Sequence, residues 1–442
     1  MRKLQVLGVL SLLCASPFQA QEVWDLKRCI DYAIEHNLTV KQQEVARDKS
    51  EVDLSTSKNS RLPDLNGSVS HSFNFGRSIQ ADNTYSSINT QNTGFNLSTS
   101  VPLFTGMQLT HNIALSKLNL SAAIEDLNKA KEDISIQVAS SYLQVLFNQE
   151  LMEVAHRQVD LSQEIKAQKE AFYKAGKASR AEWYEARSRV AQDELSAVQA
   201  DNNYKLALLD LSQLLELPSP DGFAILSPKV DTVQSQSMAM SPADIYTDAL
   251  LIKPSIKAAQ YRVQGAQKSI RIAQSAYYPK LSLGAGLSTN FYNVSGRENG
   301  NFGSQLRDNF SQYIGFSLNI PIFNRLSTRN QVRSARLQHT TLSWQLEESK
   351  KTLYKEIQQA YYNAQNASAK YRSSRVADEA AEESFALIKE KYLNGKATAT
   401  EYNESRTAWM KAVSDRIQAK YDYLFRVKIL DFYRCEYVAV VE

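Results

Sequence analysis

Two very long runs of sequence without glycine or proline constrain this chain more than any other feature. One run covers residues 107–175 and the other covers residues 326–394, and each is 69 residues long. Glycine and proline are the residues that most readily interrupt a helix, so each run predicts one uninterrupted helix. At about 1.5 Å per residue, such a helix reaches roughly 100 Å. That length is several times the width of an ordinary domain.

Apolar residues in the first run recur every seven positions. The two lines they form are Ile113, Leu120, Leu127 and Ile134, and then Val138, Val145, Met152 and Val159. A seven-residue spacing predicts coiled-coil packing. Shorter runs free of glycine and proline follow Gly176 and Gly395, over residues 177–217 and from residue 396 onward. Each half of the chain is therefore predicted to end in a long antiparallel helical hairpin that turns at a glycine.

The two halves also match each other in sequence. With an offset of 219 residues, Tyr142 meets Tyr361, and Gly176 meets Gly395. Nearer the start of each half, an offset of 216 residues places Pro63 on Pro279. The chain is therefore an internal duplication, and the change of offset falls between paired prolines, where a loop absorbs it.

Between those prolines the sequence pattern changes from a helical to a twofold period. Apolar residues alternate with serine and asparagine over two segments, at about 64–103 and about 280–323. Each segment predicts a β-hairpin with one apolar and one polar face, and the flanking prolines suit strand edges. The hairpin tips, at roughly 76–92 and 293–309, are rich in Ser, Asn and Gly and are predicted to be solvent loops.

Four strands cannot close a barrel, since the smallest membrane barrels use about eight. Open sheet edges in lipid would leave backbone groups unpaired, so a membrane location requires protomers to share one barrel. Three protomers would supply twelve strands. The alternative is a soluble coiled-coil protein in which the alternating segments are ordinary half-buried hairpins.

The N-terminus has the pattern of a secretory signal over residues 1–20. Arg2 and Lys3 precede an apolar run at residues 4–13, and Ala20 lies at a suitable cleavage point. No stretch reaches the roughly 20 apolar residues of a membrane helix. The rest of the chain divides into a first repeat at 21–217, a linker at 218–242 that is rich in proline, a second repeat at 243–430 and a C-terminal segment at 431–442.

The three cysteines leave two questions open. Cys14 lies late in the signal and raises the possibility of a lipid anchor, although residues 11–13 lack the small residue expected upstream. After removal of the signal, Cys29 and Cys435 either form a disulfide in the oxidising compartment or stay as two free structural thiols.

Charge and residue patterns exclude several classes of function. Lys and Arg total 51 against 47 Asp and Glu, a balance that argues against a nucleic-acid partner. The five histidines lack metal-ligand spacing, and the lysines after Gly176 and Gly395 lack the first glycine of a phosphate loop. We therefore expect no enzyme activity, no cofactor and no metal site.

In these features the chain resembles the TolC family of outer-membrane efflux proteins. The resemblance rests on the duplicated layout, on the segments Val101–Gly106 and Ile320–Asn324 that leave the hairpins, and on the turns at Gly176 and Gly395. It covers essentially the whole chain after the signal, and the order and spacing of the motifs make it specific.

The resemblance implies a mainly α-helical fold in a homotrimer. A twelve-stranded β-barrel would span the outer membrane, with four strands per protomer, and would continue as an α-barrel of long antiparallel coiled-coil helices across the periplasm. A small mixed α/β equatorial belt would draw on the 218–242 linker and on residues 436–441. The implied partners are outer-membrane lipid, a periplasmic adaptor and an inner-membrane pump of RND or ABC type.

The resemblance also implies two groups of functional residues. Carboxylates one helical turn apart narrow the periplasmic mouth in this family, and Glu401 and Glu404 occupy those positions, together with Tyr392 and its acidic partner Glu182. The adaptor would bind the helical turns, namely Ala175, Gly176, Lys177, Ala178 and Ser179, and Asn394, Gly395, Lys396, Ala397 and Thr398. Glutamates replace the usual aspartates, and Ala397 replaces an arginine that often ties the mouth closed. The alternative for Glu401 and Glu404 is a solvated surface pair.

These implications favour a passive exit duct for small molecules in a tripartite efflux pump. An exit duct for a type I protein secretion system is the alternative with the same architecture, because a duct discriminates mainly by size and charge. A periplasmic coiled-coil spacer that never enters the membrane is the structural alternative.

Overall fold

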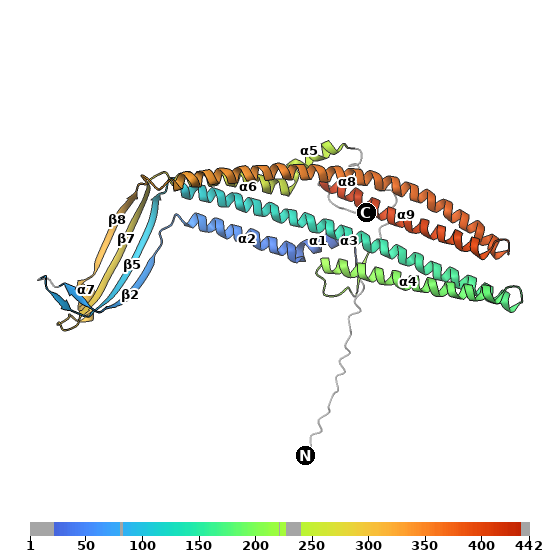
Figure 1. The fold of residues 1–442 in the computed structure, drawn as a ribbon, viewed down its shortest axis with the longest axis horizontal. Coiled ribbons are helices and arrows are strands. Elements are labelled where there is room, and N and C mark those ends of the chain that lie inside the picture. The colour runs from blue at the N-terminus through green and yellow to red at the C-terminus, as the bar shows by residue number, and fades with distance from the viewer. Residues whose placement is uncertain (1–21, 80–82, 221, 227–239, 435–442) are drawn as a thin grey trace, which may run out of the picture. The chain divides into compact units, whose positions relative to one another are not determined.

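The computed structural model describes residues 22–79, 83–220, 222–226 and 240–434 (Figure 1). The chain divides into two compact units. The first contains residues 1–41, 130–249 and 354–442, and the second contains residues 42–129 and 250–353. The predicted signal, Cys14 and Cys435 lie outside the described residues.

The helices have the same lengths in both halves of the chain. Helices α3 (Gln108–Lys174) and α8 (Ser327–Leu393) have 67 residues each, and the return helices α4 (Arg180–Leu214) and α9 (Ala399–Tyr433) have 35 each. The predicted mainly α-helical class with long antiparallel helices is confirmed. Helix α9 continues to Tyr433, so the first residues of the predicted C-terminal segment are helical. No helix in the described part of the chain is long and apolar enough to cross a membrane.

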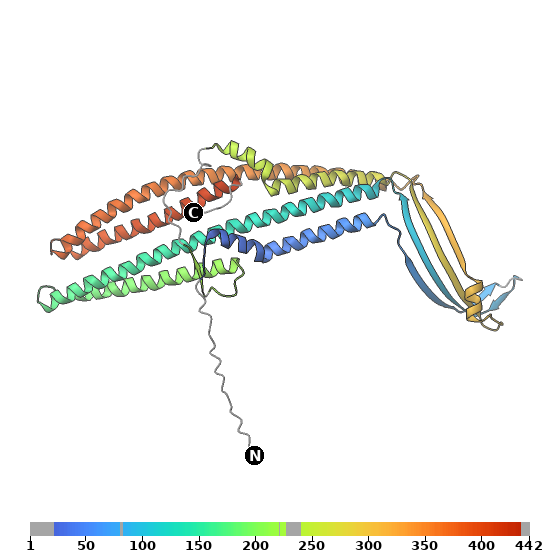
Figure 2. The same cartoon turned by 180° about the vertical axis from the view of Figure 1, so that it is seen from behind.

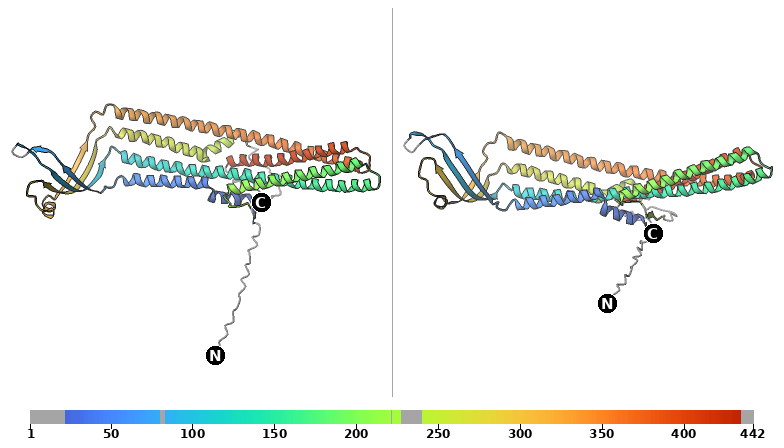
Figure 3. Two further views of the ribbon diagram at one scale, coloured as in Figure 1. Left: turned by 60° about the horizontal axis from the view of Figure 1, so that its bottom comes forward. Right: turned by 90° about the horizontal axis from the view of Figure 1, so that it is seen from below.

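The first unit contains both hairpin turns, the return helices α4 and α9, and the parts of α3 and α8 that pack against them. Helix α4 returns along α3 and helix α9 returns along α8 (Figures 2 and 3). In this unit the core-facing residues of α3 are apolar, and Ile134, Val138 and Val145 are buried, the last two at heptad spacing. Because the buried line is narrow, much of each helix surface is polar and exposed.

A short parallel sheet in the first unit joins the N-terminus to the predicted linker. Strand β1 (Glu22–Trp24) pairs with β6 (Phe223–Ile225). The buried Tyr142 hydroxyl donates to the Leu226 carbonyl at 2.6 Å, which ties this sheet to α3. Helix α1 (Leu26–His36) contains Cys29, a fully buried free thiol whose pKa burial raises to about 12. The linker therefore contains at least one ordered strand, and residues 227–239 lie outside the description.

Three further helices also come in matched lengths. Helices α2 (Leu38–Asn59) and α6 (Pro254–Ser275) have 22 residues each, and α5 (Pro242–Ile252) has 11, as α1 does. A non-helical residue separates the short helix from the longer one in both halves. In the first half it is Asn37, and in the second it is Lys253, which Pro254 follows at the first helical position.

The main sheet of the second unit is antiparallel and has the strand order β2-β5-β7-β8 (Figure 1). Its strands are β2 (Asn66–Asn74), β5 (Thr90–Phe104), β7 (Lys280–Val294) and β8 (Ser311–Asn319). The central pair β5–β7 joins the two halves of the duplication. Pro102 lies inside β5 rather than at a strand edge, and the register shifts between Pro102 and Phe104. This bulge accommodates a residue that has no backbone N–H.

The hairpin tips are more structured than the sequence predicts. Strands β3 (Arg77–Ile79) and β4 (Tyr85–Ser87) form a small ribbon in the first tip. Helix α7 (Phe302–Asp308) forms in the second tip, with Asn301 as its N-cap. Both elements lie in stretches that were predicted to be solvent loops. The composition of these stretches indicates turns but does not reveal short strands or helices that individual side chains stabilise.

Candidate functional site at the hairpin tips

The two helical hairpins of the first unit end in turns of the same construction. Gly176 and Gly395 have φ angles of 70° and 73°, in the left-handed region that favours glycine. The amide of the next residue, Lys177 or Lys396, donates to the carbonyl five residues earlier, at 2.8 Å in both turns. These are the hydrogen bonds of a helix C-terminal motif that ends at a left-handed residue. The turn residues proposed for docking lie mostly exposed at these positions.

Each return helix starts with a capping box. Ser179 caps α4 and Thr398 caps α9, and the glutamate three residues later bonds back to the cap. The Glu401 carboxylate accepts from the Thr398 amide at 2.7 Å and from its hydroxyl at 2.9 Å. These bonds hold the pKa of Glu401 below its ordinary value, with Thr398 as the main cause. Glu401 therefore has a structural role at the start of α9.

The duplication places four glutamates in equivalent positions. The 219-residue offset puts Glu182 on Glu401 and Glu185 on Glu404. The family resemblance points to Glu182 as a partner of the mouth but not to Glu185, which the same offset identifies. Glu185 and Glu404 are both exposed, and Asn403 donates to the Glu185 carboxylate at 3.2 Å.

Lys169 links the two hairpins near their turns. Its ammonium group donates to the Glu182 carboxylate at 3.0 Å and lies 4.3 Å from the centre of the Tyr392 ring. Glu182 and Tyr392, both expected near the mouth, thus contact the same lysine, which no sequence motif marks. A lysine in a polar helix gives no sequence signal of this role, and only the fold shows that its side chain is largely buried.

The contact between Lys169 and Glu182 shifts the pKa of both side chains toward their charged forms. The bond from Lys169 is the main cause that lowers the pKa of Glu182. Burial by itself would lower the pKa of Lys169, but its contacts with Glu182 and Tyr392 outweigh burial and raise that pKa. The pair is therefore charged at neutral pH.

Aromatic rings pack beneath the link. Tyr392 stacks on Tyr402 with ring centres 4.7 Å apart, and Phe385 stacks on Trp409 at 4.9 Å. Ile165 of α3 completes this core cluster, which joins the first hairpin to the second. In the other repeat, Tyr173 stacks on Trp183 at 5.4 Å. The two tips thus have the same turn and helix geometry but differ in the aromatic side chains that pack against each other.

A buried ion pair connects the two hairpins farther from the turns than the Lys169 contacts. Arg406, only 2% exposed, donates to Asp193 at 2.6 Å and to Gln158 at 3.0 Å. Lys420 donates to Glu150 at 2.9 Å farther along α9. A buried guanidinium without such partners would cost several kcal/mol, on the order of 3–5 kcal/mol. These contacts hold α9 against α3 and α4 over several turns.

The sheet of the second unit has two chemically distinct faces. One face carries alternate residues of each strand, including Val69, Leu97, Leu283 and Phe316. Ile314 and Phe316 are 75% and 73% exposed. The opposite face carries mainly Ser, Asn and Gly. Lys280, the first residue of β7, is the only Lys, Arg, Asp or Glu in these four strands. An exposed apolar face of this kind suits contact with lipid.

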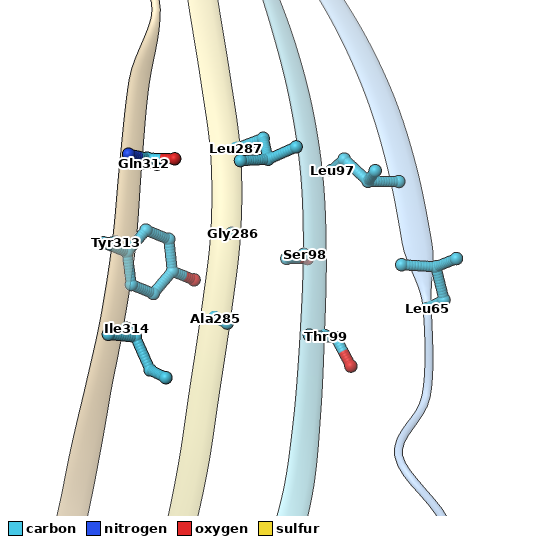
Figure 4. A pocket seen from close by; sticks show the side chains of 10 residues that line it. All are labelled: Leu65, Leu97, Ser98, Thr99, Ala285, Gly286, Leu287, Gln312, Tyr313 and Ile314. Carbon is cyan, nitrogen blue, oxygen red and sulfur yellow. The ribbon is translucent and has the colours of Figure 1, made fainter.

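A shallow groove of about 410 Å³ crosses all four chain segments of this sheet (Figure 4). Gly286 pairs with Tyr313 across β7 and β8, and a Cβ atom at Gly286 would lie 2.5 Å from the Tyr313 ring. The groove is a feature of the pleated surface, and no acidic, basic or histidine side chain lines it. Among the described residues, no cluster of three His, Cys, Asp or Glu side chains could hold a metal ion.

The fold and the tip geometry define a class of chain: an internally duplicated pair of helical hairpins joined to a four-stranded sheet with an exposed apolar face. The family model for outer membrane efflux proteins matches residues 29–216 and again 245–431, one match per repeat. The chain belongs to the outer membrane efflux protein family, which confirms the predicted family and its outer-membrane location. This family consists of transport proteins.

Individual relatives agree with this assignment. The outer membrane protein TolC of Escherichia coli is 24% identical over 373 residues, covering 78% of this chain and 71% of TolC. The pyoverdine export outer membrane protein OpmQ of Pseudomonas aeruginosa is 25% identical over 249 residues, covering 52% of this chain and 48% of OpmQ. The match therefore spans about half the length of OpmQ.

Solved structures show the same fold. The outer membrane protein VceC of Vibrio cholerae superposes with a TM-score of 0.75 at 16% identity, covering 92% of this chain and 95% of VceC. The likeness extends to both units of the chain.

Proposed function

We propose that this chain is one protomer of a homotrimeric exit duct in the outer membrane. The observation that carries the proposal is the sheet, which has four strands, an exposed apolar face and unpaired outer edges at β2 and β8 within the described residues. Lipid tolerates no open sheet edge, so edges of neighbouring copies must pair. Three copies give twelve strands, enough to close a barrel.

Exposed apolar residues on the helices support the same assembly. Val45 and Val52 lie seven residues apart on α2 and are 68% and 63% exposed. Leu337 and Trp344 have the same spacing on α8 and are 62% and 71% exposed. A second copy of the chain is the partner we assign to these stripes, because seven-residue spacing is the spacing of helix–helix packing. Helices continuing from a closed barrel would then form a ring of their own.

The duct is passive and depends on partners for energy. A periplasmic adaptor binds the turns at residues 175–179 and 394–398, and an inner-membrane pump of RND or ABC type drives transport. The exposed turns support this role, since a left-handed glycine allows close backbone approach. Small molecules are the proposed cargo. A type I protein secretion duct is the second candidate, and neighbouring genes that encode the pump would distinguish the two.

We assign the periplasmic mouth to the tip carboxylates. Glu401 and Glu404 lie three residues apart at the start of α9, so they share one helix side. Three copies would gather six such carboxylates, which attract cations. The Lys169 link between Glu182 and Tyr392 holds neighbouring hairpins of one protomer together. Adaptor binding opens the mouth by separating these hairpins.

Planar bilayers test both the duct and its mouth. The purified mature protein should give small, steady openings that prefer cations and that divalent cations block from one side. The variant Glu401→Gln/Glu404→Gln removes both charges and keeps the capping box, because glutamine also caps. We expect it to lose the cation block, whereas Glu379→Gln, at an exposed position on α8, should keep it.

Three outcomes separate the candidate functions. Conductance that is indifferent to the double variant keeps the duct and moves the mouth elsewhere. A soluble monomer without conductance, absent from the outer-membrane fraction, supports the periplasmic spacer instead. Trimers in the outer membrane that conduct and lose their block support the whole proposal.

A further inference from the structure

A cavity of about 200 Å³ lies between the two hairpins, just below the Lys169 link. Four helices line it: α3 with Ser162 and Ile165, α4 with Arg189, α8 with Tyr392, and α9 with Tyr402. All of these residues belong to the first unit. The cavity is therefore a property of the tip itself.

Two polar groups at this cavity are buried without a hydrogen-bond partner. The Tyr402 side chain is 5% exposed, and its hydroxyl oxygen bonds to no described residue. The Nε atom of Arg189 is likewise buried and makes no hydrogen bond, although the Asp193 carboxylate lies 3.5 Å from it and 34% of the Arg189 side chain is exposed. A buried donor left without a partner costs about 1–3 kcal/mol, so a ligand that accepts from both groups would recover that free energy.

Four charged side chains line the cavity: the guanidinium groups of Arg189 and Arg406 and the carboxylates of Glu182 and Glu185. Arg189 and Arg406 share a single carboxylate, that of Asp193, which bonds Arg406 at 2.6 Å and lies 3.5 Å from the Arg189 Nε. Burial and the charge of Arg406 lower the pKa of Arg189. One anion would therefore balance the two guanidinium groups.

The other acidic groups at the cavity do not supply that anion. The Glu182 carboxylate is paired with Lys169 at 3.0 Å. The Glu185 carboxylate is exposed at the rim and accepts from Asn403 at 3.2 Å. Neither contacts the Arg189 guanidinium within ion-pair distance in the described structure.

We propose that this cavity binds a small oxyanion between Arg189 of the first hairpin and Tyr402 of the second. The Nε–H of Arg189 and the Tyr402 hydroxyl both donate to its oxygens, which is the chemistry that recognises a phosphate or a carboxylate. The bound anion bridges α4 and α9 and so opposes separation of the hairpins. That regulatory role rests on the proposed mouth, whereas the binding site itself does not.

Equilibrium dialysis of the purified, detergent-solubilised protein against radiolabelled inorganic phosphate tests the site. We expect saturable binding of one phosphate per chain at constant ionic strength. Arg189→Gln should weaken binding at least about tenfold, and Tyr402→Phe should weaken it by about threefold to tenfold, since each removes one donor to a charged group. Tyr402→Phe keeps the ring that stacks on Tyr392, so this variant should fold.

Matched controls lie on the same helix outside the cavity. Arg180 and Tyr184 are exposed on α4 and contact each other at 3.3 Å. Arg180→Gln and Tyr184→Phe should therefore leave phosphate affinity unchanged. Absence of saturable binding, or an equal loss in cavity and control variants, would overturn the proposal. Phosphate binding by a protein that forms no channel would retain the site and refute the duct.

Discussion

At the level of single residues, the four glutamates at the tips have two different structural roles. Glu182 and Glu401 close capping boxes, whereas Glu185 and Glu404 are exposed one turn farther on. Because the boxes occupy the first pair, the second pair is freer to face a pore or a partner. A single pattern of glutamates three residues apart thus combines local stability with a charged surface.

The capping role of Glu401 predicts a dependence on pH. Its pKa is lowered by Thr398, so its contribution is present above the ordinary glutamate pKa of about 4.3 and is lost as pH falls through the lower folded pKa. Amide hydrogen exchange at residues 396–402, corrected for intrinsic rates, should accelerate between about pH 6 and about pH 3. In Glu401→Gln that acceleration should disappear, and in Glu379→Gln it should persist. An unchanged profile in Glu401→Gln would mean that another group controls the turn.

Some of these residues are predictable from the sequence and others are not. Glu182, Tyr392, Glu401 and Glu404 came from the family pattern, and the duplication offset would also have supplied Glu185. Lys169, Arg189 and Arg406 lack such a signal, because Lys and Arg are common on the polar faces of long helices. Lys169 and Arg406 are buried and Arg189 is partly buried because the two hairpins pack together, which no local pattern encodes.

At the level of elements, each hairpin depends on one glycine at its turn. Gly176 and Gly395 have open space around the position of a Cβ atom, so only the left-handed backbone opposes a side chain there. The sequence identified both turns because the breaker-free runs end at them. It could not show α7, whose Gln305 side chain bonds both the amide and the carbonyl of Tyr292 and so completes the edge of β7.

Replacement of the turn glycine by alanine should destabilise the turn, although the added Cβ atom contacts no neighbouring residue. Gly395→Ala is expected to cost about 1 kcal/mol from the left-handed φ angle, which raises the population of an opened tip roughly fivefold. Limited proteolysis of the tip should accelerate accordingly. Gly315→Ala is the control, because that glycine also has free space but no positive φ angle. Equal proteolysis of both variants would argue that the turn tolerates alanine.

At the level of the whole molecule, the sequence predicted the class of fold because length, duplication and strand count restrict one another. Two helices of 67 residues cannot bury themselves in one compact core, and four lipid-facing strands cannot close alone. The small sheet of β1 and β6 was beyond sequence reasoning, since three-residue strands give no periodic signal.

Assembly should fail when charge enters the exposed apolar stripe of α8. Trp344→Glu places a carboxylate in the proposed contact between copies and should weaken the trimer by at least about 2 kcal/mol per protomer. Native mass spectrometry in detergent would show this as monomer at concentrations where the wild type is trimeric. Gln345→Glu adds the same charge one residue away and should leave the trimer intact. A trimer that survives Trp344→Glu would place the contact on another face.

The two turns of one chain share a glycine, a capping residue and a glutamate, but their supporting side chains differ. Lys169 of the first repeat corresponds to Ile388 of the second, and Trp183 corresponds to Tyr402. In a ring of three copies the two kinds of turn alternate. The ring would then present six turns, three with the side chains of the first repeat and three with those of the second. A partner ring of six identical subunits would have to accept both, while a partner with three subunits could choose one.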